Sequence, residues 1–166
     1  MIIIQIDYRE KELWNVLSKE NPEISFQQIN FPIGDIQISL KNTNDEIIPL
    51  LLIERKTLSD LSSSIKDGRY EEQSFRLQDC HLFHNHNIIY LIEGDWNSYE
   101  FKQKKNKYLL PKSTLLSSMH SIQFLKGFSL LHTKNVVETR GRSESGRAPL
   151  LQQEQRGNAL CVPCER

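Results

Sequence analysis

The chain has 166 residues, 38% of them hydrophobic and 25% charged, and its 21 basic and 21 acidic residues give no formal net charge. This size and composition are typical of one soluble globular domain, and the neutral charge means that any affinity for DNA must come from local patches. Three cysteines offer no disulfide framework, and no apolar run approaches the about 20 residues of a membrane span. We therefore expect a soluble intracellular protein without membrane contact.

The first half of the chain has the pattern of four strands and one helix. Apolar or alternating runs predict strands over residues 2–6, 24–29, 35–40 and 50–54. Between the first two strands, Leu13, Trp14 and Leu17 form an apolar stripe at helical spacing, and Asn21–Pro22 would end that helix. A polar, hairpin-like loop over residues 41–46 joins the third and fourth strands.

The second half of the chain alternates helices and strands. A short helix is predicted to end at Ile65, and Gly68 should supply a positive φ where the chain turns. The next helix is predicted over residues 69–83, with Glu72 and Arg76 spaced for an ion pair one turn apart. Further along, the patterns predict a strand over 87–93, a helix over 115–125 and a strand over 128–132. This alternation indicates a mixed α/β sheet.

A charged cluster directly follows the most apolar strand of the first half. Because side chains alternate along a strand, Glu54 and Lys56 should point to one face and Arg55 to the other. A carboxylate and an ammonium at the end of a buried strand suit phosphate-ester hydrolysis, in which the carboxylate binds a divalent metal and the lysine orients or deprotonates water. A surface strand could carry the same pair as a simple ion pair, so the pair alone is a weak signal.

A second carboxylate lies upstream of this cluster. Asp35 follows a Pro–Gly turn and enters a strand, and 18 residues separate it from Glu54. Two adjacent strands and their loop would bring both carboxylates together, so Asp35 and Glu54 are candidate metal ligands, with Lys56 as the group that positions water. Solvated acids at strand ends are the alternative.

These residues closely resemble the GD…ERKxxxD motif of the XPF family of structure-selective endonucleases, with Gly34–Asp35, then Glu54–Lys56 and Asp60. The run 64–77 is most similar to the crossover-junction (Holliday-junction) branch of that family, and the resemblance covers roughly residues 3–137. It implies a restriction-endonuclease-like core, a mixed β-sheet flanked by helices. It also implies Mg²⁺ as cofactor, with Mn²⁺ able to substitute, and a homodimer or a heterodimer with a related subunit.

The resemblance also implies roles for residues around the motif. Asp7, at the end of the first strand, would contribute to the metal site, although it could equally cap the following helix. We assign Arg55 to structural ion pairing, with Asp60 as its candidate partner, and Gly34 to the turn before Asp35. A helix face that could follow the DNA backbone, or simply be solvated, carries Arg69, Gln73 and Arg76.

A basic run farther along the chain is another candidate for DNA contact. It reads as a loop flanked by Phe101 and Tyr108, and it contains Lys102, Lys104, Lys105 and Lys107. Charge and aromatic stacking could bind branched DNA there, whereas a solvated loop is the alternative. The cluster of Cys80 with nearby histidines lacks zinc-ligand spacing and is read as a helix end.

The composition changes abruptly at Thr139. Every lysine, isoleucine, tyrosine and phenylalanine precedes this residue. We therefore predict a nuclease domain over residues 1–138 and a disordered tail over 139–166, which is either foreign to the fold or a native extension.

Together these patterns predict a Mg²⁺-dependent endodeoxyribonuclease. The resemblance implies that it hydrolyses a phosphodiester bond in branched DNA, such as a 3′ flap, fork or junction, in repair or recombination, and in the nucleus if the organism is a eukaryote. One alternative is a non-catalytic DNA-binding partner subunit of a heterodimeric nuclease, against which the intact Asp35, Glu54, Lys56 and Asp60 argue. A nuclease without structure selectivity is a second alternative.

Overall fold

A six-stranded mixed sheet forms the centre of the computed structural model, which describes residues 1–17 and 24–139. The strand order is β2-β1-β3-β4-β5-β6. The strands are β1 (Ile2–Asp7), β2 (Ile24–Ile29), β3 (Ile36–Lys41), β4 (Ile47–Thr57), β5 (Ile88–Glu93) and β6 (Ser129–Thr133). β3 pairs antiparallel with β1 and β4, whereas the β1–β2, β4–β5 and β5–β6 pairs are parallel. Because these pairs are parallel, the carboxyl ends of β4, β5 and β6 lie at the same end of the sheet.

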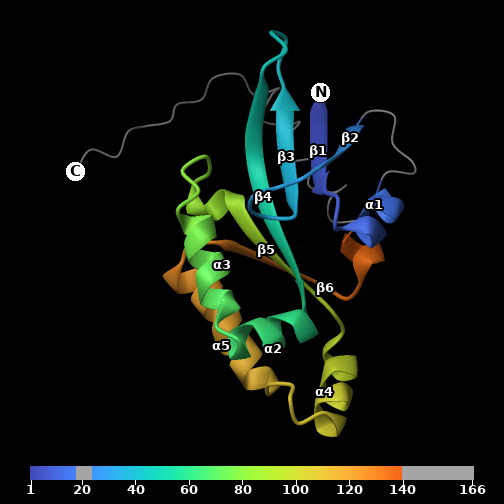
Figure 1. The fold of residues 1–166 in the computed structure, drawn as a ribbon, viewed down its shortest axis with the longest axis vertical. Coiled ribbons are helices and arrows are strands. Elements are labelled where there is room, and N and C mark those ends of the chain that lie inside the picture. The colour runs from blue at the N-terminus through green and yellow to red at the C-terminus, as the bar shows by residue number, and fades with distance from the viewer. Residues whose placement is uncertain (18–23, 140–166) are drawn as a thin grey trace, which may run out of the picture.

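Helices cover both faces of the sheet (Figure 1). One face is covered by α2 (Leu58–Lys66), α3 (Arg69–Gln78) and α5 (Lys112–His120), and we call it the α2–α3–α5 face. The helix α1 (Lys11–Leu17) lies on the opposite face, which we call the α1 face. The remaining elements are the 3₁₀ turn η1 (Asn85–Asn87), the helix α4 (Trp96–Lys105) and the π-helical η2 (Ser121–Leu125). No helix in the described ranges has both the length and the apolar character of a membrane span.

Each face of the sheet has its own hydrophobic core. On the α2–α3–α5 face, Leu61, Leu77 and Leu115 are fully buried against strand residues such as Ile88. On the α1 face, Leu13 packs with inward-facing isoleucines of β1 and β3. Since β4 and β5 lie between the two cores, polar side chains on these strands need partners that compensate for their burial.

The predicted fold class is confirmed, and several element boundaries differ from expectation. β4 continues to Thr57 instead of ending at Glu54, because its parallel pairing with β5 runs on to Thr57 opposite Glu93. α3 ends at Gln78, earlier than the predicted residue 83, and the basic run begins on α4, so the predicted loop there is wrong.

Local predictions after α2 are confirmed only in part. Gly68 has the expected positive φ, 74°. The predicted Glu72–Arg76 ion pair is wrong, because Arg76 Nη2 donates to the Pro32 carbonyl oxygen at 2.9 Å instead. The proposed stop at Asn21–Pro22 and residues 140–166 of the predicted tail lie outside the described residues.

Candidate metal and DNA site

The backbones of three acidic residues, Asp7, Asp35 and Glu54, are neighbours at the same end of the sheet, on or next to β1, β3 and β4. The Asp7 backbone N–H donates to the Asp35 carbonyl oxygen at 2.8 Å, and the Asp35 N–H donates to the Ile53 carbonyl oxygen at 2.9 Å. These bonds place Asp35 opposite Glu54, on the face where α3 packs. The sequence spacing correctly predicted that Asp35 and Glu54 come together.

Gly34 makes this close approach possible. Its φ is +77°, a conformation that residues with a side chain rarely adopt, and a Cβ at this position would meet Leu52 Cδ1 at 2.7 Å. The turn therefore requires glycine, which explains why Gly34 precedes Asp35.

Asp35 and Glu54 share a low-dielectric environment. Asp35 Oδ2 accepts a hydrogen bond from the Arg55 backbone N–H at 2.8 Å, and Glu54 is 6% exposed. Burial raises the pKa of Asp35 above its ordinary 3.8, and burial together with the Asp35 charge raises the pKa of Glu54 above 4.5. Two carboxylates held this close favour either a proton or a cation between them.

The Lys56 ammonium lies beside Glu54. Its Nζ lies 3.6 Å from Glu54 Oε1 and donates to Gln73 Oε1 at 2.8 Å. A pocket of about 110 Å³ opens beside Asp35 and Glu54, lined by Arg9, Gly34, Asp35, Glu54, Gln73 and Arg76. Carboxylate oxygens are the ligands that Mg²⁺ prefers, and the guanidinium groups of Arg9 and Arg76 line the same pocket. The residues present therefore fit a hydrated divalent ion.

The Asp7 carboxylate, unlike those of Asp35 and Glu54, is bound by an arginine side chain. The Asp7 side chain is fully buried, and Oδ1 accepts from Arg9 Nε at 2.7 Å while Oδ2 accepts from Arg9 Nη2 at 3.1 Å and from the Phe31 N–H at 3.0 Å. The hydrogen bonds from Arg9 lower the pKa of Asp7 to about 2. No cluster of three potential ligands is formed among the described residues, so Asp7 would have to exchange Arg9 for a metal.

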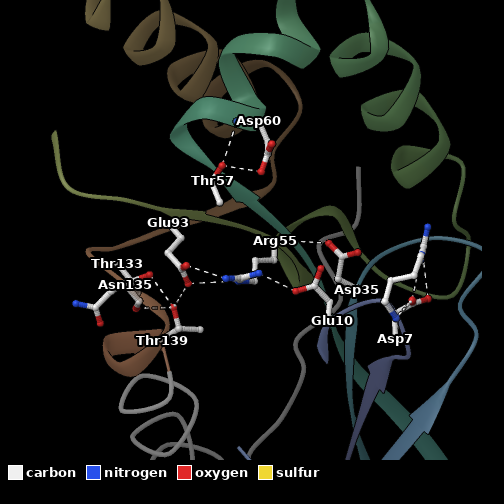
Figure 2. Close-up of polar contacts among 11 residues, drawn as sticks. Asp7, Glu10, Asp35, Arg55, Thr57, Asp60, Glu93, Thr133, Asn135 and Thr139 are labelled. Atoms are coloured by element: carbon white, nitrogen blue, oxygen red, sulfur yellow. Dashed lines mark hydrogen bonds and ion pairs between the residues drawn. The ribbon is translucent and has the colours of Figure 1, made fainter. Parts of the chain in front are cut away.

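Arg55 points to the opposite α1 face, as the strand alternation predicted. Figure 2 shows it between Glu93 and Glu10, with Nη2 2.7 Å from Glu93 Oε1 and Nη1 2.7 Å from Glu10 Oε2. We call Glu10, Arg55 and Glu93 the α1-face ion network. Glu93 Oε2 also accepts a hydrogen bond from Thr139 Oγ1 at 3.0 Å, which ties the start of the predicted tail to the sheet.

The predicted Arg55–Asp60 pair is wrong. Because β4 continues to Thr57, Asp60 lies in the first turn of α2, and its Oδ2 accepts from the Thr57 hydroxyl at 2.6 Å. Thr57 Oγ1 in turn accepts from the Asp60 N–H at 3.1 Å. Asp60 therefore takes part in the N-terminal cap of α2, immediately after the strand that carries Glu54 and Lys56.

The predicted DNA-binding residues separate into three locations. Arg69 is exposed and pairs with Asp67 at 2.9 Å, whereas Gln73 and Arg76 line the pocket beside Glu54. The basic residues Lys102, Lys104 and Lys105 lie on α4, with Lys107 just beyond it. Phe101 is 60% and Tyr108 81% exposed, and Lys105 Nζ lies 4.1 Å from the centre of the Phe101 ring.

Known proteins are similar to this chain in both sequence and fold. The ERCC4 domain matches residues 6–140. The human structure-specific endonuclease subunit MUS81 is 38% identical over 114 residues, 64% of this chain and 19% of that protein. The probable crossover junction endonuclease mus81 of Dictyostelium discoideum is 34% identical over 125 residues, 70% of this chain and 13% of that protein. The chain thus spans less than a fifth of the length of these relatives.

Solved structures agree with this grouping. XPF from Aeropyrum pernix in complex with DNA has a TM-score of 0.62 and 22% identity, covering 96% of this chain and 69% of that chain. XPF from the same organism in another structure has a TM-score of 0.63 and 21% identity, covering 99% of this chain and 67% of that chain. These matches confirm the XPF-type fold and the crossover-junction resemblance. The chain belongs to the ERCC4 domain family.

Proposed function

We propose that this protein is a metal-dependent endonuclease that hydrolyses a phosphodiester bond in branched DNA, such as a 3′ flap, fork or junction, in repair or recombination. The observation that carries the proposal is the pair of carboxylates that line one pocket, the half-buried Asp35 and the buried Glu54, with the Lys56 ammonium beside Glu54. The names of the MUS81 relatives support the choice of reaction and of a branched substrate.

In this proposal Asp35 and Glu54 hold Mg²⁺, or Mn²⁺ in its place. The bound ion would neutralise charge on the scissile phosphate and lower the pKa of the attacking water. The Arg55 backbone N–H fixes one oxygen of Asp35. Gln73 holds Lys56 close to Glu54, where the ammonium orients the attacking water. Asp7 would be a further ligand only if Arg9, which now binds it, moved to a phosphate.

DNA would reach this pocket along basic side chains. Arg76 lines the pocket itself, and Arg69 lies at the start of the same helix. We propose that the lysines of α4 and Lys107 bind a second part of the branched substrate, with Phe101 and Tyr108 offering exposed rings for stacking. Phosphate contacts of this kind position the DNA without reading its sequence.

We also propose that the domain pairs with a second copy or a related subunit. Three large apolar side chains of α5 and η2 are exposed: Leu116, Phe124 and Leu125, at 36%, 74% and 82%. Apolar groups gathered on neighbouring helices are typical of an interface between subunits.

A comparison of two substrates tests the proposed function. We expect wild-type protein with Mg²⁺ to cut an end-labelled 3′-flap duplex near the branch and to leave a linear duplex of equal length largely intact. Equal cleavage rates would refute the structure selectivity and favour a general nuclease. Binding of the flap without cleavage, even with a candidate partner subunit added, would favour the non-catalytic DNA-binding subunit.

A further inference from the structure

One buried hydroxyl in the described part of the chain has no hydrogen-bond partner, and it belongs to Tyr90 in β5. Tyr90 is 0% exposed. The other two buried tyrosines are paired: Tyr70 donates to the Ser118 carbonyl oxygen at 3.0 Å and Tyr99 to the Leu110 carbonyl oxygen at 2.7 Å. A buried hydroxyl without a partner is unfavourable, so Tyr90 calls for an explanation that core packing alone does not supply.

The position of Tyr90 relates it to the candidate metal site. In the parallel β4–β5 pairing, Tyr90 is the direct neighbour of Glu54, and neighbouring residues in a parallel pair point to the same face. Burial raises the pKa of the Tyr90 hydroxyl, and the negative charges of Glu54 and Asp35 add to this effect. The ring is fixed by stacking on Phe128, at a centroid distance of 5.9 Å and an interplanar angle of 17°.

The Glu54 carboxylate can accept a further hydrogen bond. Its nearest partner is the Lys56 ammonium at 3.6 Å, which is longer than a direct hydrogen bond. A carboxylate has about four lone-pair positions, so one oxygen can bind a cation while the other accepts a hydrogen bond. The Tyr90 ring is packed in place, so in our proposal the Glu54 side chain turns toward it.

We propose that Tyr90 is a positioning residue that donates its hydroxyl hydrogen to the Glu54 carboxylate while Glu54 holds the divalent ion. The inference rests on the proposed metal site and adds a partner behind it. A hydrogen bond to an ionised carboxylate is stronger than one between neutral groups, and such a partner orients a ligand and increases the metal affinity. Tyr90 would thus be unpaired in the metal-free protein and paired in the metal-bound one.

The test is to replace Tyr90 with phenylalanine and to measure Mn²⁺ binding by electron paramagnetic resonance together with the thermal unfolding of the metal-free protein. Tyr99→Phe is the matched control, since that hydroxyl is buried but already paired with Leu110. We expect Tyr90→Phe to weaken Mn²⁺ binding by about tenfold or more, without lowering the Tm of the metal-free protein. Tyr99→Phe should lower the Tm and leave Mn²⁺ affinity unchanged.

The Mn²⁺ affinity decides the matter, whatever the Tm does. An affinity of Tyr90→Phe within about twofold of wild type, where loss of such a partner should cost tenfold or more, would overturn the proposal. Asp35→Asn, measured alongside, separates the two levels of inference. If wild type binds no more Mn²⁺ than Asp35→Asn, the metal site fails and the role of Tyr90 fails with it. If Asp35→Asn loses binding while Tyr90→Phe does not, only the role of Tyr90 fails.

Discussion

Removal of the Arg55 side chain should destabilise the fold far more than removal of an exposed arginine. In the α1-face ion network, the exposed fraction of the side chain is 11% for Arg55, 10% for Glu93 and 20% for Glu10. Arg55→Ala would leave two largely buried carboxylates without their cation. Breaking a buried ion pair in this way typically costs about 3–5 kcal/mol.

Urea denaturation measures the effect. With an m-value of about 2 kcal/mol/M, the midpoint of Arg55→Ala should fall by roughly 1.5–2.5 M. Arg69→Ala is the matched control, because Arg69 forms a comparably short ion pair with Asp67 but both side chains are more than half exposed, at 62% and 55%. Its loss should cost no more than about 1 kcal/mol.

A double-mutant cycle with Glu93→Gln then tests whether the cost arises from the pair itself. We expect an interaction energy of about 0.5–3 kcal/mol between the two sites, since Glu93 accepts two hydrogen bonds from Arg55. If Arg55→Ala lowers the midpoint no more than Arg69→Ala does, the network does not stabilise the fold, and the reasoning from burial is refuted.

Three further perturbations have defined outcomes. Burial raises the pKa of Asp35 in the folded state, so the metal-free protein loses stability as the pH rises from the ordinary 3.8 through the raised value. Asp35→Asn should therefore be more stable than wild type at about pH 8 and equally stable at a pH below the ordinary pKa of aspartate. Thermal unfolding measures this difference across the pH range, and equal Tm values at every pH would contradict the raised pKa of Asp35. Gly34→Ala should cost about 2–4 kcal/mol, because φ is +77° and the added Cβ would meet Leu52; a urea midpoint equal to that of wild type would show that the turn tolerates a side chain. Replacing the basic run by glutamine should weaken flap binding and reduce the slope of log affinity against log salt by about 0.9 for each lost phosphate contact; an unchanged slope would rule out contact through Lys102, Lys104, Lys105 and Lys107.

Local patterns predicted much of the sheet and the two faces of β4. Alternation alone placed Glu54 and Lys56 together and Arg55 opposite, and the spacing from Asp35 to Glu54 predicted that their strands are neighbours, as the β3–β4 pairing shows. These features depend on residues that are close together in the sequence, which is why the sequence alone predicts them.

Partners from distant elements could not be predicted in this way. Arg55 pairs with Glu10 and Glu93, which are 45 and 38 residues away, whereas the nearby Asp60 was the only candidate that the local pattern offered. Tyr90 lies inside an apolar run, and nothing in the local pattern distinguishes it from an ordinary core residue. Its relation to Glu54 depends on the β4–β5 register.

A recognisable signal was overlooked at α4. Asp95 precedes the basic run, and its side chain accepts a hydrogen bond from the Ser98 N–H at 2.8 Å, an N-terminal helix cap. An aspartate three residues before a serine at the end of a buried strand could have predicted a helix where we expected a loop.

The most direct test of the metal-dependent reaction is cleavage of an end-labelled 3′-flap duplex in Mg²⁺ by wild type, Asp35→Asn and Asp45→Asn. Asp45 is an exposed loop residue with a φ of 65°, a conformation that asparagine also tolerates, so its replacement controls for the change of residue type. We predict cleavage by wild type and by Asp45→Asn, and binding without cleavage by Asp35→Asn. Cleavage by Asp35→Asn at the wild-type rate would contradict the assignment of the metal site to Asp35 and Glu54.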